Sequence, residues 1–94
     1  MKLIAMAAVA SIALATAGAA NAQEALAKSS GCMNCHDVSA KKVGPSFKDI
    51  SAKYKGKADA EATLTAKLSK GEGHPAVKAS PDDVKNIVKW LLSQ

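Results

Sequence analysis

An apolar stripe with the 3.6-residue period of an α-helix runs through the last part of the chain. It consists of Val84, Ile87, Val88, Leu91 and Leu92. Ahead of the stripe, Ser80 can cap a helix and Pro81 suits its first position, where a missing N–H costs nothing. Asp82 and Asp83 follow where the helix macrodipole favours negative charge. The sequence therefore predicts a helix that begins after Ser80 and packs its apolar face on other elements.

Three shorter segments have helical patterns, and a glycine that can end a helix follows each of them. They are residues 24–30, 47–55 and 59–70, followed by Gly31, Gly56 and Gly71. The second follows Ser46, which can serve as its N-cap. Their apolar positions include Phe47, Ile50, Tyr54, Ala60, Leu64 and Leu68. Since no strand-like alternation is present, we expect an all-α fold of about four short helices.

The start of the chain has the pattern of a secretory signal peptide. Lys2 precedes an apolar run over residues 3–17, and residues 20–22 read Ala-Asn-Ala, a small-residue cleavage pattern. The alternative is an uncleaved membrane anchor, but the run is alanine-rich and shorter than the ~20 apolar residues a membrane span needs. We expect residues 1–22 to be removed, leaving residues 23–94 as one periplasmic domain, monomeric and without a membrane anchor.

The expected mature chain is small and poor in aromatic residues. It has 72 residues, near the size at which an apolar core alone is marginally stable. Its aromatic residues are Phe47, Tyr54 and Trp90, and we interpret Trp90 as a core or interface residue. A large bound group would supply the missing apolar surface.

The charge of the mature chain is positive and comes from lysine alone. Without Lys2, 12 lysines face 8 acidic residues, and the chain has no arginine. Nucleic-acid binders usually use arginine and stacked aromatic residues, so this class is disfavoured. A soluble acidic protein fits better as a partner. Six lysines gather after the cysteine motif and can steer such a partner: Lys41, Lys42, Lys48, Lys53, Lys55 and Lys57.

Residues 31–36 read GCMNCH, and Cys32, Cys35 and His36 within them match the C-x-x-C-H pattern of covalent haem attachment. Two thiols at this spacing can form thioethers with the two haem vinyl groups. The adjoining imidazole of His36 can then bind the iron as the proximal ligand through Nε2. Export to an oxidising compartment agrees with this chemistry. We therefore expect one covalent haem c with its iron.

Two other chemistries use the same residues. A zinc site could draw on Cys32, Cys35, His36 and His74, but His36 directly follows Cys35 and is poorly placed to share a small ion with both thiolates. A redox dithiol needs a βαβ setting that this helical chain lacks, and a structural disulfide would close too small a loop to stabilise much.

With these motifs, the mature chain resembles the short bacterial class I cytochromes c of the periplasm. The resemblance covers, in order, GCMNCH, KKVGPSFKDISAKY, DAEATLTAKLSKG and SPDDVKNIVKWLLSQ. It implies a bundle wrapped around one haem, with the first and last helices crossing. It also implies that the Pro45 carbonyl accepts the Nδ1 proton of His36 and orients that ring.

The chain departs from the family pattern between Gly71 and Ser80, where the sequence is shorter and holds no methionine. The family's distal methionine lies about six residues before the cap of the last helix, and here that position is His74, followed by Pro75. We expect His74 to be the distal iron ligand. Met33 lies in the attachment loop and is expected to be an apolar filler, whereas Lys78 would first have to lose a proton.

Two imidazole ligands leave no open position on the iron, so we expect electron transfer rather than catalysis, at a lower potential than His/Met ligation gives. Two alternatives remain open. If His74 does not reach the iron, a five-coordinate haem could bind or sense a small gas. The chain could also be the permanent haem subunit of a periplasmic redox enzyme.

Overall fold

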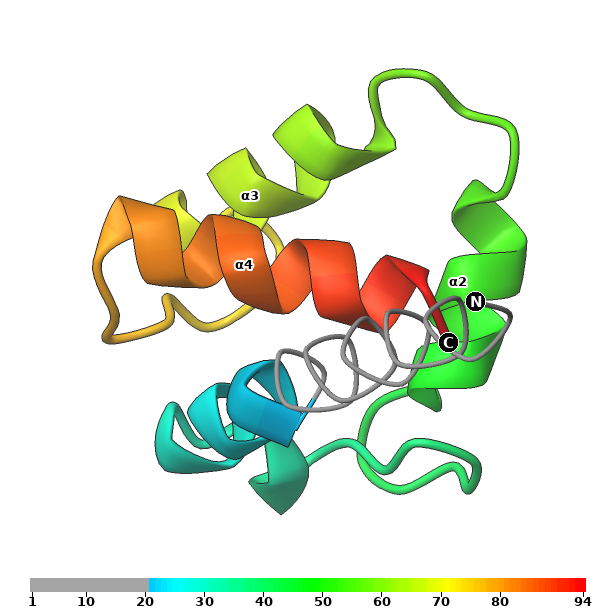
Figure 1. The fold of residues 1–94 in the computed structure, drawn as a ribbon, viewed down its shortest axis with the longest axis horizontal. Helices are drawn as coiled ribbons and strands as arrows, with labels where there is room; N and C mark the ends of the chain where they lie inside the picture. The colour runs from blue at the N-terminus through cyan, green and yellow to red at the C-terminus, as the bar shows by residue number, and fades with distance from the viewer. Residues whose placement is uncertain (1–20) are drawn as a thin grey trace, which may run out of the picture.

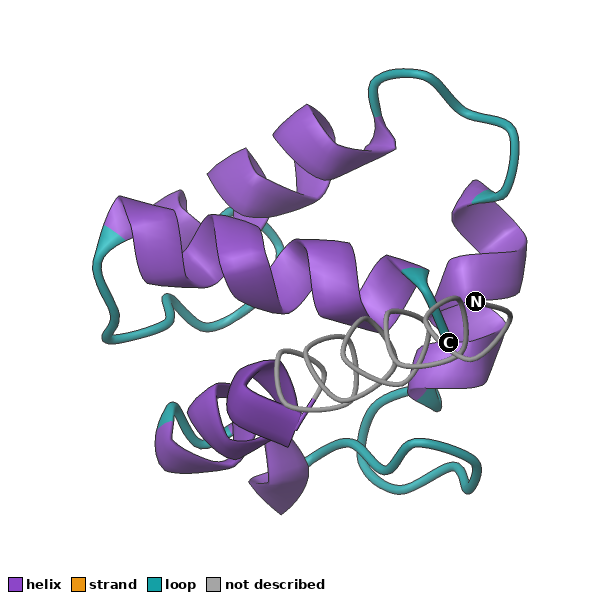
Figure 2. Ribbon diagram, viewed as in Figure 1, coloured by secondary structure: helices purple, strands orange, loops and turns teal. Residues whose placement is uncertain are grey.

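Figure 1 shows the computed structural model, which describes residues 21–94. Every regular element in this part of the chain is helical (Figure 2). Residues 21–29 are helical and belong to the first helix, and the other helices are η1 (Cys32–Asn34), α2 (Phe47–Tyr54), α3 (Ala60–Lys70) and α4 (Pro81–Leu92). The all-α prediction is therefore confirmed. The expected signal peptide lies almost wholly outside the described residues, and no helix between residues 21 and 94 has the length and hydropathy of a membrane span.

Local capping explains where the helices begin and end. The Ser46 hydroxyl accepts a hydrogen bond from the Asp49 backbone N–H at 3.1 Å, and Ser80 accepts one from Asp83 at 3.2 Å, as the sequence predicts. Gly71 ends α3 in the left-handed conformation, with φ of 75°. The first helix differs from the prediction, because it is already helical at residue 21 rather than starting at residue 24.

Helix α4 forms the centre of the core (Figure 1). Both α2 and α3 contact it. Its side chains Ile87 and Val88 are fully buried, and Trp90 meets the Phe47 ring edge-on at 5.4 Å between centroids. Ala27 of the first helix is also fully buried in this core, where its small side chain lets the helices approach closely. The apolar stripe predicted for the last helix is thus the face on which the other helices pack.

Two loops flank this core. One joins the attachment motif to α2, and the other joins α3 to α4. These loops carry the two histidines of the chain, His36 and His74, so the helices serve to hold two loops in place.

Candidate functional site

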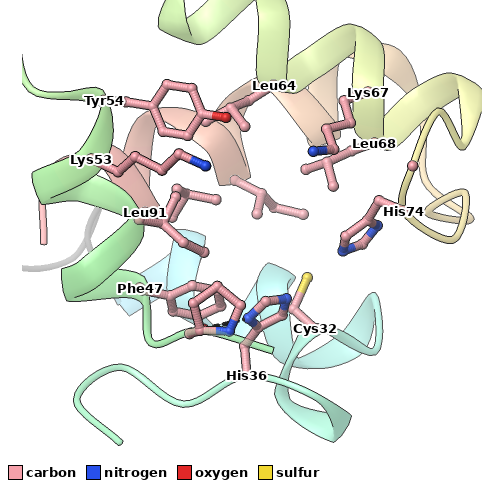
Figure 3. A pocket seen from close by; sticks show the side chains of 14 residues that line it. Cys32, His36, Phe47, Lys53, Tyr54, Leu64, Lys67, Leu68, His74 and Leu91 are labelled. Carbon is pink, nitrogen blue, oxygen red and sulfur yellow. Dashed lines mark hydrogen bonds between the residues drawn. The ribbon is translucent and has the colours of Figure 1, made fainter. Parts of the chain in front are cut away.

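A cavity of about 280 Å³ lies between the helices and the two loops (Figure 3). Most of its wall is apolar, from side chains of α2, α3 and α4 such as Ile50, Leu64 and Leu91. Cys32 and His36 enter it from the attachment motif, and His74 enters it from the loop after α3. Cys32 and His74, which are 42 positions apart in the sequence, therefore share one apolar pocket.

The His36 ring is held by its neighbours on three sides. Its Nδ1 atom lies 2.6 Å from the Pro45 carbonyl oxygen. A carbonyl oxygen can only accept a hydrogen bond, so Nδ1 carries the proton and the neutral ring keeps a free lone pair on Nε2. The Phe47 ring stacks on the imidazole with 5.3 Å between centroids. These contacts fix both the tautomer and the orientation of the ring, as a metal ligand requires.

Gly44 forms part of the cradle around the same imidazole. A β-carbon at this position would lie 2.8 Å from Nδ1 of His36 and 3.0 Å from Nε2, and closer still to Cε1. Real contacts of this kind are almost never so short, so only glycine allows the backbone to approach the ring here. The Gly44 N–H also donates a 2.7 Å hydrogen bond to the Cys35 carbonyl, which ties the loop to the cysteine motif.

The second histidine faces the first across the pocket. The ring centroids of His36 and His74 are 6.0 Å apart, and the ring planes are parallel to within 9°. The His74 Nδ1 atom lies 2.7 Å from the Pro75 carbonyl oxygen, so here too Nδ1 carries the proton and leaves the lone pair on Nε2. Two imidazoles with free Nε2 atoms thus converge on one pocket.

The two cysteines differ in their surroundings. Both thiols are free, and Cys32 is partly buried in the pocket wall whereas Cys35 is exposed. Burial raises the pKa of the Cys32 thiol. The backbone N–H groups of Cys35 and His36 both donate to the Cys32 carbonyl, at 3.3 and 3.0 Å, and so form the tight turn that brings the motif together.

The donors present fit a haem and not a zinc ion. Between residues 21 and 94 the structure brings no three histidine, cysteine, aspartate or glutamate side chains together around a common metal position. A zinc site needs such a cluster, whereas a haem iron takes only two axial ligands from the protein. Two thiols can form the thioethers of a covalent haem, and imidazoles in an apolar pocket can supply its axial ligands.

Sequence reasoning missed part of the pocket. Lys53, Tyr54 and Lys67 line the wall formed by α2 and α3. Lys67 and Leu68 lie three and four residues after Leu64. This helical spacing could have placed Lys67 on the pocket side of α3. The sequence places Lys53 only in the surface lysine group, but its ammonium lies 5.6 Å from the centroid of the Tyr54 ring at the pocket edge.

The other distal candidates are placed differently from His74. Lys78 is exposed and is not part of the pocket wall, and Met33 is partly buried against the core, as expected of an apolar filler. The Met33 carbonyl accepts a 2.9 Å hydrogen bond from the Lys42 ammonium, so one of the six lysines is engaged in holding the loop.

Comparison with known proteins shows the family of this chain. Residues 19–94 match the family described as cytochrome c. The chain belongs to the cytochrome c family. A cytochrome c-552 of Hydrogenobacter thermophilus is 40% identical over 84 residues, which cover 82% of this chain and 86% of the relative. A cytochrome c-551 of Pseudomonas aeruginosa is 38% identical over 78 residues, 76% of this chain and 75% of the relative.

Solved structures of cytochromes c share the fold. The crystal structure of the class 1 cytochrome MtoD from Sideroxydans lithotrophicus aligns with a TM-score of 0.72 and 41% identity, over 78% of this chain and 92% of that one. Wild-type cytochrome c552 of Nitrosomonas europaea aligns with a TM-score of 0.66 and 37% identity, over 74% and 96%. As a cytochrome c, this protein binds one covalent haem c with its iron and is an electron carrier rather than an enzyme. Homologous c-type cytochromes are typically periplasmic.

Proposed function

We propose that this cytochrome c is a periplasmic electron carrier whose haem is bonded to Cys32 and Cys35 and held between the imidazoles of His36 and His74. The haem, when bound, takes up and releases one electron at its iron. The observation that carries the proposal is the pair of parallel imidazoles facing one pocket with 6.0 Å between their centroids.

The spacing of the two rings supports paired histidine ligation. A metal–imidazole bond is about 2 Å long, as found at zinc. Two such bonds, with the short distance from each bonding nitrogen to its ring centroid, give about 6 Å between the two centroids. The centroids of His36 and His74 are 6.0 Å apart, which agrees with this sum. Both rings already hold their protons on Nδ1, hydrogen-bonded to the Pro45 and Pro75 carbonyls.

His36 is the proximal ligand in this proposal because it directly follows Cys35 and is the better supported ring. Its contact with the Pro45 carbonyl increases the basicity of Nε2, as hydrogen bonds to ligating histidines do. Phe47 on one face and Gly44 at the edge keep the ring from rotating. Only the Pro75 carbonyl holds the His74 ring, so His74 is the more readily displaced ligand.

Other distal ligands are less well supported. Lys78 lies outside the pocket wall, and Lys67, which does line it, would have to lose a proton before its amine could bind a metal. The sequence holds no methionine after Met33. Because imidazole donates electrons more strongly than a thioether, His/His ligation favours the ferric form and gives a lower potential than His/Met ligation.

The proposed partner is a redox protein with an acidic docking surface. Lys41, Lys48 and Lys55 are exposed. The single ion pair found within residues 21–94 joins Lys28 to Glu24, so the positive charge of the lysines after the cysteine motif is available to attract a partner. Such charges raise the rate of encounter more than the affinity, which suits a carrier that must release its partner quickly.

Substitution of His74 tests the ligand assignment. We expect His74→Ala to convert the ferric protein from low spin to high spin and to let the ferrous protein bind carbon monoxide. We expect His74→Met to remain low spin with a raised potential, since it supplies the sulfur of His/Met ligation. Lys78→Ala is the control and should behave as wild type. Absorption and electron paramagnetic resonance spectra with potentiometry give these readouts.

The same spectra can contradict the proposal. If His74→Ala leaves the ferric spin state unchanged and the ferrous variant still does not bind carbon monoxide, His74 is not the distal ligand. If the wild-type ferrous protein binds carbon monoxide readily, the haem is open on its distal side and the small-ligand alternative is favoured instead.

A further inference from the structure

The Lys42 side chain joins two segments on the proximal side of the pocket. Its ammonium donates a 2.9 Å hydrogen bond to the carbonyl of Met33, which lies between the two cysteines. Its backbone N–H donates to the Gly44 carbonyl at 3.1 Å, and the Gly44 N–H donates to the Cys35 carbonyl at 2.7 Å. One residue therefore connects the loop that bears the thiols with the glycine that lies against the His36 ring.

The backbone of the attachment loop leaves the Met33 carbonyl to this side chain. The N–H groups of Cys35 and His36 both donate to the Cys32 carbonyl, at 3.3 and 3.0 Å. The next carbonyl along the chain, that of Met33, accepts from the Lys42 ammonium instead. A hydrogen bond from a charged donor is stronger than one between neutral groups, so an exposed lysine can hold this loop.

The Lys42 ammonium also keeps its positive charge unpaired. The ion pair found between residues 21 and 94 joins Lys28 to Glu24. The acidic residue of the loop, Asp37, accepts the backbone N–H groups two and three positions after it, at 3.0 and 2.9 Å. A positive charge is therefore hydrogen-bonded to the loop that carries both thiols.

We propose that Lys42 is a positioning residue for the haem. Its ammonium holds the loop between Cys32 and Cys35 against the Gly44 cradle of His36 and fixes a positive charge beside the two thioether bonds. This rests on the proposed function, because the loop can position a haem only if both cysteines are bonded to it. Reduction adds one negative charge to the haem, so a positive charge fixed on this loop favours the ferrous form.

The test compares two variants of Lys42 in the holoprotein. Lys42→Met keeps the length of the side chain and removes its ammonium, whereas Lys42→Arg keeps a charged donor. The matched control is Lys41→Met, which removes the same charge from the neighbouring exposed position. Nuclear magnetic resonance of the reduced protein measures hydrogen exchange at the Gly44 N–H, which reports opening of the loop. Equilibration with small redox mediators measures the reduction equilibrium constant of the haem.

We expect Lys42→Met to speed exchange of the Gly44 N–H by about fivefold to tenfold, as the loss of one hydrogen bond does. It should also lower the reduction equilibrium constant by about threefold, because the charge on the loop is gone. Lys42→Arg should stay within about twofold of the wild type in both measurements. Lys41→Met should do so as well, because an ammonium surrounded by water and salt is screened. Neither measurement involves a partner protein, so docking by these lysines does not enter.

Both readouts must change for the proposal to stand. It fails if Lys42→Met leaves the exchange of the Gly44 N–H at the wild-type rate, or if Lys41→Met changes both readouts as much. It also fails if Lys42→Met speeds exchange but leaves the reduction equilibrium at the value of Lys41→Met, because Lys42 then only stabilises the loop.

Failure of the proposed function has different signs. A wild-type ferric haem that is high spin contradicts the assignment of His74 alone, and the exchange and equilibrium results still decide the role of Lys42. A wild type without thioether-bonded haem, shown by mass spectrometry before any variant is compared, contradicts the proposed function itself and this role of Lys42 with it.

Discussion

Substitution of Gly44 by alanine tests the packing around the proximal histidine. The new β-carbon would lie 2.8 Å from Nδ1 of His36 and 3.0 Å from Nε2, so the ring or the loop must move. The ring cannot move without disturbing its 2.6 Å hydrogen bond to the Pro45 carbonyl and its stacking on Phe47. Overpacking of this kind costs about 1–3 kcal/mol, and a lost hydrogen bond adds about 1 kcal/mol.

We therefore expect Gly44→Ala to lower the free energy of unfolding by about 2–4 kcal/mol, which corresponds to about 10–20 °C in Tm for a domain of this size. Guanidinium unfolding of the holoprotein, followed by circular dichroism, measures the loss. Gly56→Ala is the control, because Gly56 has φ of 79° but open space around its Cβ position, so strain of about 1 kcal/mol is its whole cost. Gly44→Ala should also alter the visible spectrum, and Gly56→Ala should not. Equal losses with unchanged spectra in both variants would refute the steric argument.

Two further substitutions test the core and the helix caps. Phe47 is 2% exposed and touches both His36 and Trp90, so Phe47→Leu should lower the free energy of unfolding by about 2 kcal/mol in guanidinium titrations. A loss no larger than that of Val77→Ala, at a partly buried position, would argue against these aromatic contacts. Ser80→Ala should cost about 1 kcal/mol in thermal unfolding and Ser80→Asn much less, since asparagine also caps; equal losses would show that the cap contributes nothing.

Local sequence signals predict the helices well because each depends on neighbours in the chain. Ser46 and Ser80 cap the helices that follow them, and Gly71 ends α3 in the left-handed conformation that glycine adopts without strain. Hydrogen bonds that form over three or four residues leave a pattern that can be read without knowing the fold.

The pocket is less predictable because it depends on contacts between distant segments. Lys67 lines the pocket only because α3 packs against α4 on one particular face, and neither helix alone determines that face. The role of Gly44 depends on where the His36 ring lies after the loop has folded back. The C-x-x-C-H spacing is the exception, since all three side chains lie on one tight turn.

The loop after α3 is fastened in a way that brings His74 to the pocket. The N–H of Gly71 donates to the Lys67 carbonyl at 3.0 Å, and further along the N–H of Val77 donates to the Leu68 carbonyl at 2.9 Å. Both ends of the loop are therefore fastened to the last turn of α3, and Val77 also packs against the core. His74 lies between these two hydrogen-bonded points, so only a short stretch of chain separates it from a fixed residue on either side. A longer free loop would pay more conformational entropy to hold a ligand at the same place. The fastening of this loop is therefore compatible with the distal role that we propose for His74.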